Sequence, residues 1–385
     1  MKIGFDISQT GKLKAGCGYF ADSLIQALAG IDSENEYLLY PNFGTTFWDP
    51  DAATGTSKIN KKNFRRIIEN VSAAECAAFW KALPEDGESR AGNPDIIHSN
   101  NYSAPDGLRN ASLVYTLYDL SFLDHPEFST EQNRLSCFNG VFEASLRADM
   151  IVAISDYSRK KYIEYFPLYP AERIEVAYPA SRFNSKDMVT DSSNPYTDLK
   201  KNGFWLTVGT LEPRKNLRRL LNAYARLAGD GSGKPLVLAG AQGWLEDDLE
   251  HVIAEMGISG RVRIPGYVDD NQLLWLYRNC HAFVYPSLYE GFGLPVLEAM
   301  SQGAAVATSN VTSLPEIAGD VALYFDPSDT ESIYSALKRL DTVPDLIPEL
   351  KRMGLQQAEK FSWDATAGKV LNIYARVRGL PRYRK

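Results

Sequence analysis

The amino-acid sequence predicts an α/β protein with two doubly wound parallel sheets, each forming one domain. Three observations support this prediction. Short apolar runs alternate with helical segments, the alternation restarts after a polar stretch near the middle, and the chain has 385 residues. Single hydrophobic cores stop growing at roughly 250–300 residues, so two domains are expected. Strands that alternate with helices are typical of parallel sheets.

In the first half, the short apolar runs end in polar residues. We expect strands at KIGFDIS (2–8), PDIIHSN (94–100), LVYTLYDL (113–120) and DMIVAIS (149–155). A glycine-containing stretch follows the first strand and leads into an apolar helix through Leu28. Ligands of such sheets bind beyond the carboxyl ends of the strands. The candidate binding residues are therefore Gly16 to Tyr19, His98 to Tyr102, Tyr118 to Ser121 and Ser155 to Tyr157.

The second half repeats the architecture without an evident sequence repeat. A polar stretch from about Arg182 to Asn202 reads as a linker. The expected strands are 204–210, 235–240, 261–266, 281–287, 304–309 and 321–327, with an amphipathic helix at 216–228 and a last helix at about 365–378. The predicted division is residues 1–185 for the first domain, 186–363 for the second, and 364–385 for a C-terminal helix.

Composition excludes several functional classes. Apolar residues make up 44% and charged residues 23%, as in ordinary globular proteins, and the net charge of −7 does not favour nucleic acid. The four cysteines show no metal-ligand spacing, which indicates a reduced setting. The start lacks the order of a signal peptide, and no apolar run reaches the about 20 residues of a membrane span. We therefore expect a cytoplasmic protein.

Peripheral contact with the inner face of a membrane is an alternative location. KINKKNFRR (58–66) and SRKKYIEYF (158–166) carry several cations with interleaved aromatic residues. Such runs are more often solvated faces, so they leave the question open.

Two positive side chains follow one predicted strand and precede a predicted helix. In LTVGTLEPRKN (206–216), Arg214 and Lys215 stand at the carboxyl end of the strand. An isolated Arg-Lys pair is usually a solvated surface feature. In this setting, however, the two cations suit a diphosphate, which needs two adjacent positive donors.

A second motif, SLYEGFGLPVLEAM, places two carboxylates around a glycine-rich turn that opens a helix. Gly291 and Gly293 allow close approach of the backbone to a ligand, and N–H groups at a helix start bind anions. Glu298, about one turn into the helix, can accept two hydrogen bonds from a ribose diol. Glu290 lies in the loop and would face whatever extends from the distal phosphate. Two surface glutamates are the alternative, which the glycines, the proline and the preceding strand disfavour.

Segments along nearly the whole chain resemble the retaining glycosyltransferases of family 4. They are AGCGYF, TLYDLSFLDHPEF, ADMIVAISDYSRKKYIEYF, RIEVAYP, VGTLEPRKNLRRLLNAY, RIPGYVDDNQLLWLYRNCHAFVYPSLYEGFGLPVLEAM, SNVTSLPEIAGDVALYFDP and FSW. The most specific of these signals is the E-x7-E arrangement of Glu290 and Glu298. The resemblance implies the GT-B fold, in which two Rossmann-like domains face each other across a deep cleft that holds a nucleotide-sugar. The C-terminal helix is expected to cross back onto the first domain.

The resemblance also implies roles for individual residues. Arg214 and Lys215 would hold the diphosphate. Glu298 would hold the ribose, and Glu290 would contact the donor sugar. Asp119 and Ser155 would lie near the sugar or the acceptor. The remaining donor-binding residues would be Gly16, Gly18, Tyr267, Val268, Gly291, Phe292, Gly293 and Leu294.

One position departs from the family pattern, because Tyr118 stands before Asp119 where a histidine is usual. That histidine is expected to contact the transferred sugar. A tyrosine hydroxyl can donate one hydrogen bond but has no cationic form at neutral pH. Three explanations are open for this tyrosine. Catalysis here does not need an imidazole, the donor sits differently, or the enzyme is inactive. The first is favoured because the phosphate and ribose residues are intact. His98 follows a strand and could face the acceptor.

The predicted reaction moves a hexose from a nucleoside-diphosphate sugar to a hydroxyl of a glycan or lipid-linked glycan, with retention, in bacterial surface-polysaccharide assembly. Mannose from GDP-mannose is favoured, with a UDP- or dTDP-sugar as the alternative. No cofactor or metal is expected, because Arg214, Lys215 and the helix start would stabilise the leaving diphosphate. The Asp247-Asp248 pair belongs to an acidic helix that looks solvated.

Three rival functions remain. A dinucleotide-binding oxidoreductase needs GxGxxG directly after the first strand, and AGCGYF lacks that spacing. A sugar epimerase of the same fold would not explain this set of family 4 segments. A non-catalytic glycan- or nucleotide-binding protein is the rival from another class, and Tyr118 is its only support.

Overall fold

Two parallel sheets are present in the computed structural model, which describes residues 1–12, 14–44, 55–183, 187, 190, 193–196, 198–243 and 248–383. The chain divides into two compact units. Unit 1 is Met1–Pro179 together with Ser362–Lys385, and unit 2 is Ala180–Phe361. The boundaries of 185/186 and 363/364 expected from the sequence lie a few residues further along the chain. The α/β class and the two parallel sheets predicted from the sequence are confirmed.

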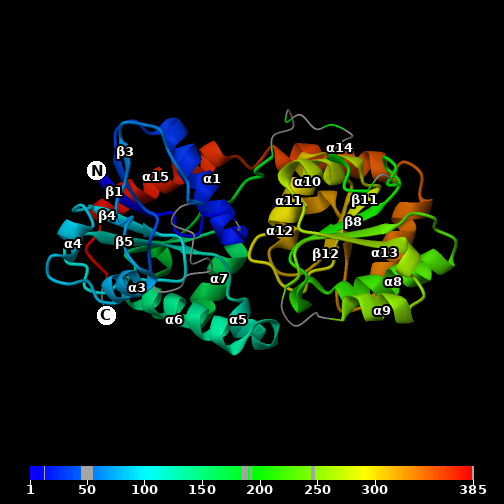
Figure 1. Ribbon diagram of the computed structural model, residues 1–385, viewed down its shortest axis with the longest axis horizontal. Coiled ribbons are helices and arrows are strands. Elements are labelled where there is room, and N and C mark those ends of the chain that lie inside the picture. The colour runs from blue at the N-terminus through cyan, green and yellow to red at the C-terminus, as the bar shows by residue number, and fades with distance from the viewer. Residues whose placement is uncertain are drawn as a thin grey trace. The chain divides into compact units, whose positions relative to one another are not determined.

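The sheet of unit 1 has seven parallel strands in the order β3-β2-β1-β4-β5-β6-β7 (Figure 1). Strand β1 pairs with β2 on one side and with the central strand β4 on the other, so that Phe5 lies opposite Leu39 and His98. The strands are β1 Lys2–Asp6, β2 Glu36–Tyr40, β3 Phe64–Arg66, β4 Ile96–Ser99, β5 Ser112–Leu117, β6 Met150–Ala153 and β7 Ile174–Val176. The four strands predicted here are confirmed. Strand β2 and the short strands β3 and β7 at the sheet edges were not predicted from the sequence.

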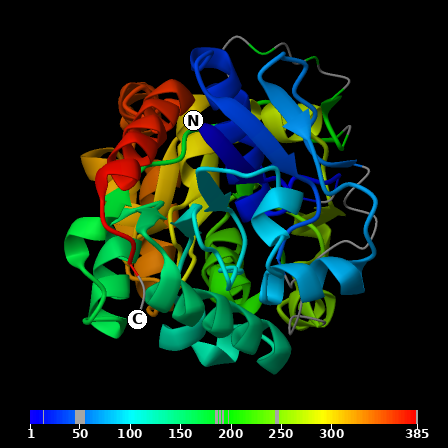
Figure 2. The same ribbon diagram turned by 90° about the vertical axis from the view of Figure 1, so that its left-hand side faces the viewer.

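Helices cover both faces of this sheet. One core packs the sheet against α3, α6 and α7, with Trp80, Val141 and Tyr162 fully buried. The other face is covered by α1 and α15, which pack together (Figure 1). Figure 2 faces unit 1 and shows red α15 across the strands from teal α6. The helices are α1 Gly16–Ile31, α3 Ala73–Lys81, α4 Gly87–Arg90, α5 Ser121–Asp124, α6 Glu131–Arg147, α7 Asp156–Tyr165 and α15 Trp363–Gly379, with 3-10 turns η1 Pro126–Phe128 and η2 Ala171–Arg173.

The glycine-containing stretch after β1 differs from its expected form. The helix was expected after the glycines, but α1 begins at Gly16, so Gly16 and Gly18 form its first turn. A Cβ at Gly18 would lie 2.0 Å from the carbonyl oxygen of Gln9, so this glycine permits a close backbone contact. A Cβ at Gly16 would meet nothing within 4 Å.

The sheet of unit 2 has six parallel strands in the order β10-β9-β8-β11-β12-β13. They are β8 Trp205–Val208, β9 Leu236–Ala239, β10 Val262–Gly266, β11 Ala282–Tyr285, β12 Val306–Ser309 and β13 Leu323–Phe325. All six were predicted from the sequence. The chain runs outward from β8 to β10, then returns to place β11 beside β8. This reversal of strand order is where doubly wound sheets bind ligands.

Both faces of the unit 2 sheet are buried. Leu220, Leu221 and Tyr224 of α8 pack with α9 and α13 in one core, and Leu276 and Val296 pack α10 and α11 into the other. The helices are α8 Leu217–Gly229, α9 Leu249–Glu255, α10 Asp270–Asn279, α11 Leu294–Ser301, α12 Leu314–Ala318, α13 Thr330–Thr342 and α14 Leu346–Ala358, with 3-10 turns η4 Pro213–Lys215, η5 Ser259–Arg261 and η6 Gly319–Val321.

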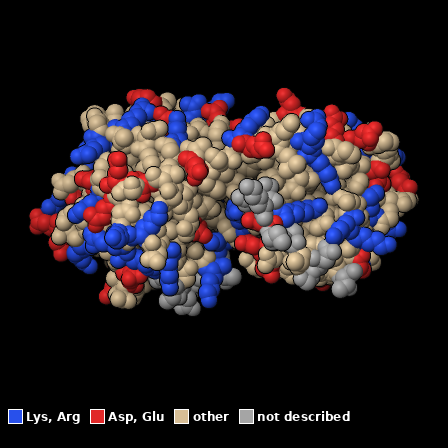
Figure 3. Space-filling model, turned by 90° about the horizontal axis from the view of Figure 1, so that it is seen from above, with Lys and Arg blue, Asp and Glu red and all other residues tan. Residues whose placement is uncertain are grey.

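Figure 3 shows basic and acidic side chains interspersed on the visible face. Within the part of the chain that the structure describes, no helix is both long and apolar enough to cross a lipid bilayer.

Candidate active site

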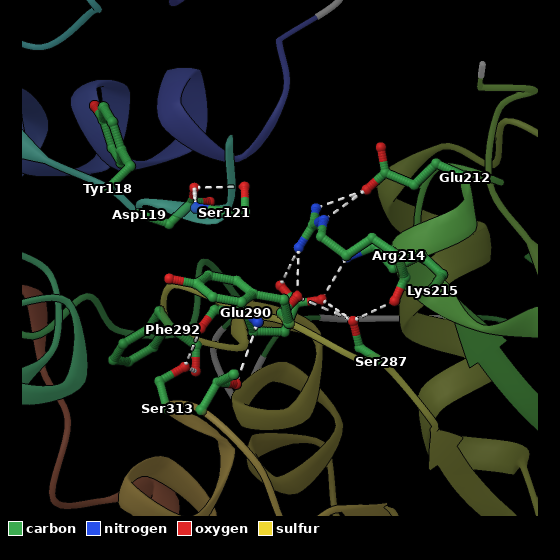
Figure 4. A network of polar contacts seen from close by, with 12 residues as sticks. Tyr118, Asp119, Ser121, Glu212, Arg214, Lys215, Ser287, Glu290, Phe292 and Ser313 are labelled. Atoms are coloured by element: carbon green, nitrogen blue, oxygen red, sulfur yellow. Dashed lines mark hydrogen bonds and ion pairs between the residues drawn. The ribbon is translucent and has the colours of Figure 1, made fainter. Parts of the chain in front are cut away.

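The switch point of unit 2 brings together the two charged motifs found in the sequence. Arg214 and Lys215 follow β8, and Glu290 follows the neighbouring strand β11. The carboxyl ends of parallel neighbours lie at the same edge of a sheet. Residues separated by about 75 positions in the chain therefore meet in one cluster, which Figure 4 shows.

Local sequence fixes the two cations in place. Pro213 begins the 3-10 turn η4, and Asn216 ends it in a left-handed conformation with φ of 58°. The Asn216 side-chain amide donates to the carbonyl oxygens of Pro286 at 3.0 Å and Pro327 at 2.8 Å. These bonds tie the turn to the segments after β11 and β13. Asparagine suits this position because it tolerates the left-handed region and supplies the donor.

Glu290 is the centre of the cluster and is almost fully buried. Its Oε1 accepts from the Lys215 ammonium at 2.7 Å, the Tyr285 hydroxyl at 2.9 Å and the Ser287 hydroxyl at 2.6 Å. Its Oε2 forms an ion pair with Arg214 Nη1 at 2.9 Å. Burial alone would raise the pKa of this carboxyl, but the charges of Arg214 and Lys215 outweigh it and hold the pKa at about 2. Glu290 is therefore ionised and rigidly held.

A second carboxylate balances the cluster on the other side of Arg214. Glu212 Oε1 accepts from Arg214 Nη2 at 2.6 Å and from Nε at 3.1 Å. Arg214 Nη1 also donates to the carbonyl oxygen of Tyr289 at 2.9 Å. The guanidinium plane is thus fixed from three directions, which preorganises it for an anionic ligand.

The glycine-rich turn then leads into α11. Gly293 has φ of +107°, which a residue with a side chain would adopt only under strain, and a Cβ there would lie 2.8 Å from the Leu314 side chain. The Ser313 hydroxyl lies 2.9 Å from the carbonyl oxygens of both Glu290 and Phe292 and braces the turn (Figure 4). In the first turn of α11, which begins at Leu294, Pro295 has no N–H, and the N–H groups of Val296 and Leu297 donate to the carbonyl oxygen of Gly293 at 3.0 and 3.2 Å. This end of the helix carries the positive end of its dipole.

Glu298 lies on α11 and does not join this cluster. Its Oε2 accepts from the Tyr277 hydroxyl at 3.2 Å, and its Oε1 forms an ion pair with Arg182 Nε at 3.1 Å. Burial raises the pKa of Glu298, and the charge of Arg182 opposes that rise. The two predicted base-lining residues follow β10, where Tyr267 is 59% exposed and Val268 is buried. The two glutamates thus have separate environments, and their different roles toward a donor remain predictions.

In unit 1, Tyr118 is used for packing. It is only 7% exposed, and its hydroxyl donates to the carbonyl oxygen of Asn100 at 2.9 Å and lies 3.2 Å from that of Cys17. Its ring meets Phe20 of α1 edge-on. The one hydrogen bond that the hydroxyl can donate is therefore already made within unit 1. Asp119 is half-buried. Its Oδ1 accepts from the backbone N–H of Ser121 at 3.0 Å and from the hydroxyl of Ser121 at 2.8 Å.

His98 and Ser155, predicted near the acceptor, also have structural contacts. His98 is fully buried, with Nε2 2.9 Å from the Thr116 hydroxyl and Nδ1 2.6 Å from the Tyr374 hydroxyl of α15. Burial lowers its pKa to about 3, so it is neutral. A histidine with no exposed surface and two protein partners does not face an acceptor in this structure. Ser155 caps α7 by accepting from the backbone N–H of Ser158 at 3.0 Å.

Several residues of the site were not predicted from the sequence. Tyr285 and Ser287 stand directly before the glycine-rich turn, and their position at or just after the end of β11 could have marked them as site residues. Glu212 stands two residues before Arg214, and this short separation could have marked it as a partner of the arginine. Arg182 and Tyr277 gave no signal, because they reach Glu298 only through folding. Over the described residues, no group of three or more His, Cys, Asp or Glu side chains could hold a metal ion. Asp247 lies outside them.

Comparisons with known proteins agree with this fold. Residues 190–355 match the family described as "Glycosyl transferases group 1". The chain is 38% identical over 287 residues to "O-antigen chain mannosyltransferase B" of Escherichia coli, an alignment that covers 72% of this chain and 74% of the relative. It is also 36% identical over 242 residues to the E. coli "Serotype-specific mannosyltransferase WbdA", covering 60% of this chain but only 29% of that longer relative.

These matches show that the chain belongs to the group 1 glycosyltransferase family, also called family 4. Solved structures show the same fold. Sucrose-phosphate synthase from Thermosynechococcus elongatus superposes with a TM-score of 0.74 and 18% identity, covering 98% of this chain and 99% of that one. Anabaena Alr3699/HepE, solved in complex with UDP and glucose, has a TM-score of 0.71 and 19% identity, covering 98% and 100%. The protein is a glycosyltransferase of the GT-B fold class.

Proposed function

We propose that this protein transfers mannose from GDP-mannose to a hydroxyl of a glycan or lipid-linked glycan, with retention of configuration, during assembly of a bacterial surface polysaccharide. The observation that carries the proposal is the cluster of Arg214, Lys215 and Glu290 at the switch point of unit 2. The choice of mannose is supported by the relatives, which are named as mannosyltransferases of O-antigen chains. A UDP- or dTDP-sugar donor is the alternative.

Lys215 has a donor left for a diphosphate. An ammonium has three N–H donors, and Lys215 directs two of them to Tyr285 and Glu290. Its third donor has no partner among the described residues. The Arg214 side chain keeps 20% of its surface exposed. A diphosphate would meet Lys215, Arg214 and the N-terminus of α11 together, and these groups would stabilise the charge that develops as the donor bond breaks.

We expect Glu290 to contact the donor sugar through one of its two carboxylate oxygens. Its Oε1 already accepts three hydrogen bonds, so the donor sugar would contact Oε2, which carries only the Arg214 ion pair. Because Glu290 binds both cations, it also fixes their positions. In the reaction we propose, the bond between the sugar C1 and the phosphate oxygen breaks and a bond from C1 to the acceptor oxygen forms. The acceptor proton goes to the departing phosphate.

A non-catalytic nucleotide-binding protein is the second candidate. Tyr118 favours it, since its hydroxyl is bonded to the backbone of unit 1 and supplies no imidazole. Under that alternative the protein would bind GDP-mannose without consuming it. Turnover of the donor, by transfer or by slow hydrolysis, separates the two candidates.

The experiment compares donor consumption with GDP-mannose, UDP-glucose and dTDP-rhamnose at saturating donor. The Arg214→Ala/Lys215→Ala variant should lose roughly 100-fold or more of the turnover, as when a preorganised donor to a developing anion is removed. The matched control is Arg218→Ala/Arg226→Ala, which removes two exposed arginines of α8 that pair with Asp248 and Glu331. Unchanged turnover in the first variant would overturn the diphosphate assignment, and no turnover with any donor would favour the second candidate.

A further inference from the structure

Arg182, near the start of unit 2, makes a contact that the sequence did not suggest. Its Nε lies 3.1 Å from Oε1 of Glu298, and its Nη1 lies 3.3 Å from Oδ1 of Asp270. The Arg182 side chain is 16% exposed and that of Glu298 only 8%. The polar stretch that begins at Arg182 was interpreted only as a linker. Its first residue instead reaches the carboxylate expected to bind the ribose.

We propose that Arg182 is a positioning residue for the donor nucleotide, which holds the Glu298 carboxylate ionised and oriented toward the ribose hydroxyls. This inference rests on the proposed function, because it needs a ribose-containing ligand at Glu298. Arg182 itself would act through Glu298 and would not need to touch the donor.

The backbone of Arg182 is anchored on both sides. The Ser181 hydroxyl lies 2.9 Å from the hydroxyl of Ser301, which is the last residue of α11. Phe183 is buried in the core beside α10 and meets the ring of Tyr277 edge-on. The guanidinium lies over the Phe183 ring, 4.6 Å from its centre. The position of Arg182 is therefore built into the packing of α10 and α11, and little entropy is lost in making the ion pair.

The opposite side of Glu298 is fixed by Tyr277. This hydroxyl, from α10, donates to Oε2 of Glu298 at 3.2 Å, while Arg182 contacts Oε1. A carboxylate has about four acceptor sites on its two oxygens. With one protein partner on each oxygen, each can still accept one hydroxyl. That capacity matches the two adjacent hydroxyls of a ribose.

The charge of Arg182 is needed because Glu298 is buried. Burial raises the pKa of Glu298, Asp270 adds to the rise, and Arg182 and the Tyr277 hydrogen bond oppose it. If Arg182 lost its charge, the Glu298 carboxyl would bind a proton nearer to neutral pH. A protonated carboxyl has fewer acceptor sites, so it would hold two ribose hydroxyls less well.

The experiment measures how strongly the protein prefers a ribose diol. Affinities for GDP and for 2′,3′-dideoxy-GDP are measured by calorimetry from pH 6 to pH 9, and their ratio is taken. The ratio cancels the titration of the phosphates, which both ligands share. The variants are Arg182→Gln, Arg182→Lys and, as a matched control, Arg278→Gln, which removes a neighbouring partly buried arginine that binds Gln302.

The wild-type ratio should be roughly tenfold or more and constant over this pH range, since two hydrogen bonds to a charged group are at stake. The ratio for Arg182→Gln should approach one at pH 6 and recover toward pH 9. Arg182→Lys should stay within about threefold of the wild type because it keeps the charge, and Arg278→Gln should match the wild type. If Arg182→Gln does not fold, the constancy of the wild-type ratio still tests the idea, because a ratio that falls from pH 8 to pH 6 would show that Glu298 is not held ionised.

Two results would overturn the inference while leaving the proposed function intact. If the affinity ratio of Arg182→Gln equals that of the wild type, Arg182 does not act on ribose binding. If the ratio of Arg182→Gln is larger, Arg182 competes with the ribose for Glu298. A wild-type protein that transfers mannose with a ratio of one would remove the ribose role of Glu298 and this inference together. A wild type that neither binds GDP nor turns over any donor would instead overturn the proposed function.

Discussion

The switch points of the two sheets have the same topology but differ in the side chains that they carry. In unit 2, the point between β8 and β11 carries two cations and two carboxylates, with Lys215 and Glu290 at its centre. In unit 1, the residues at the point between β1 and β4 form hydrogen bonds with each other. The backbone N–H of Asn100 donates to Oδ2 of Asp6 at 3.0 Å, and its side-chain amide donates to the Asp6 carbonyl oxygen at 3.1 Å.

This difference shows that topology locates a possible site while charge decides what it can bind. The polar residues at the strand ends of unit 1, such as Tyr118, His98 and Ser155, satisfy hydrogen bonds of their own unit. Those of unit 2 are charged, and Lys215 directs two of its three N–H donors to Tyr285 and Glu290. The comparison can be tested by removing groups from each side.

The largest expected effect is on stability and comes from Lys215. Lys215→Met removes a buried partner of Glu290 and should lower the free energy of unfolding by about 3–5 kcal/mol, because it leaves a buried charge with less compensation. Adding Glu290→Gln should restore much of that loss. Urea denaturation measures both variants. The control is Lys234→Met, which breaks a more exposed ion pair with Asp341 and should cost no more than about 1 kcal/mol.

A Lys215→Met variant as stable as this control would contradict the description of a buried, mutually dependent cluster. It would also remove the contrast between the two switch points, because the cation would then be a solvated surface residue.

The second prediction concerns acid. The pKa of Glu290 is lowered from 4.5 to about 2 by Arg214 and Lys215. A depressed carboxyl pKa stabilises the folded state above the unfolded value and loses that contribution as pH falls through the folded value. The wild type should therefore lose roughly 2–3 kcal/mol more than Lys215→Met/Glu290→Gln as pH falls from about 5 toward 2. Urea titrations at a series of pH values measure the difference, and a constant difference would contradict an ionised Glu290.

A third prediction compares one residue from each unit directly. Glu290→Gln keeps the size of the side chain but loses the charge that fixes Arg214 and Lys215, so transfer should fall on the order of 100-fold. Tyr118→Phe removes only a hydroxyl bonded to the Asn100 carbonyl, and should cost about 1 kcal/mol of stability with transfer within roughly threefold of the wild type. Initial rates of transfer and thermal unfolding of both variants measure these effects. A 100-fold loss in Tyr118→Phe would restore Tyr118 as a catalytic residue.

Much of unit 2 could be predicted because its signals are local in sequence. Arg214 and Lys215 lie next to each other between a strand and a helix, and Glu290 and Glu298 lie on either side of one turn. Four of the strands of unit 2, β8, β9, β11 and β12, are short runs that are almost fully buried. The start of α1 was predicted less well, because glycines normally disfavour helices. The close contact of Gly18 with Gln9 explains one of the two glycines in the first turn.

The partners that complete the site could not be predicted, since they depend on distances across the fold. Arg182 and Glu298 are 116 positions apart, and no periodicity or composition links them. The structural use of His98 was hidden for the same reason, because its partner Tyr374 lies on the last helix. A polar residue at a strand end has two possible uses, and its neighbours in space decide between them.

The smallest expected effect separates those two uses at Ser155. Ser155→Ala removes the acceptor for the Ser158 backbone N–H at the start of α7, and loss of such a cap should lower the free energy of unfolding by about 1 kcal/mol. Transfer should stay unchanged, because the hydroxyl is fully buried and bonded within unit 1. Ser155→Thr keeps the capping oxygen and should recover the stability. Were Ser155→Ala instead to lose tenfold in transfer at full stability, the hydroxyl would have to contact the acceptor, and unit 1 would hold a binding residue where its contacts now indicate only a helix cap.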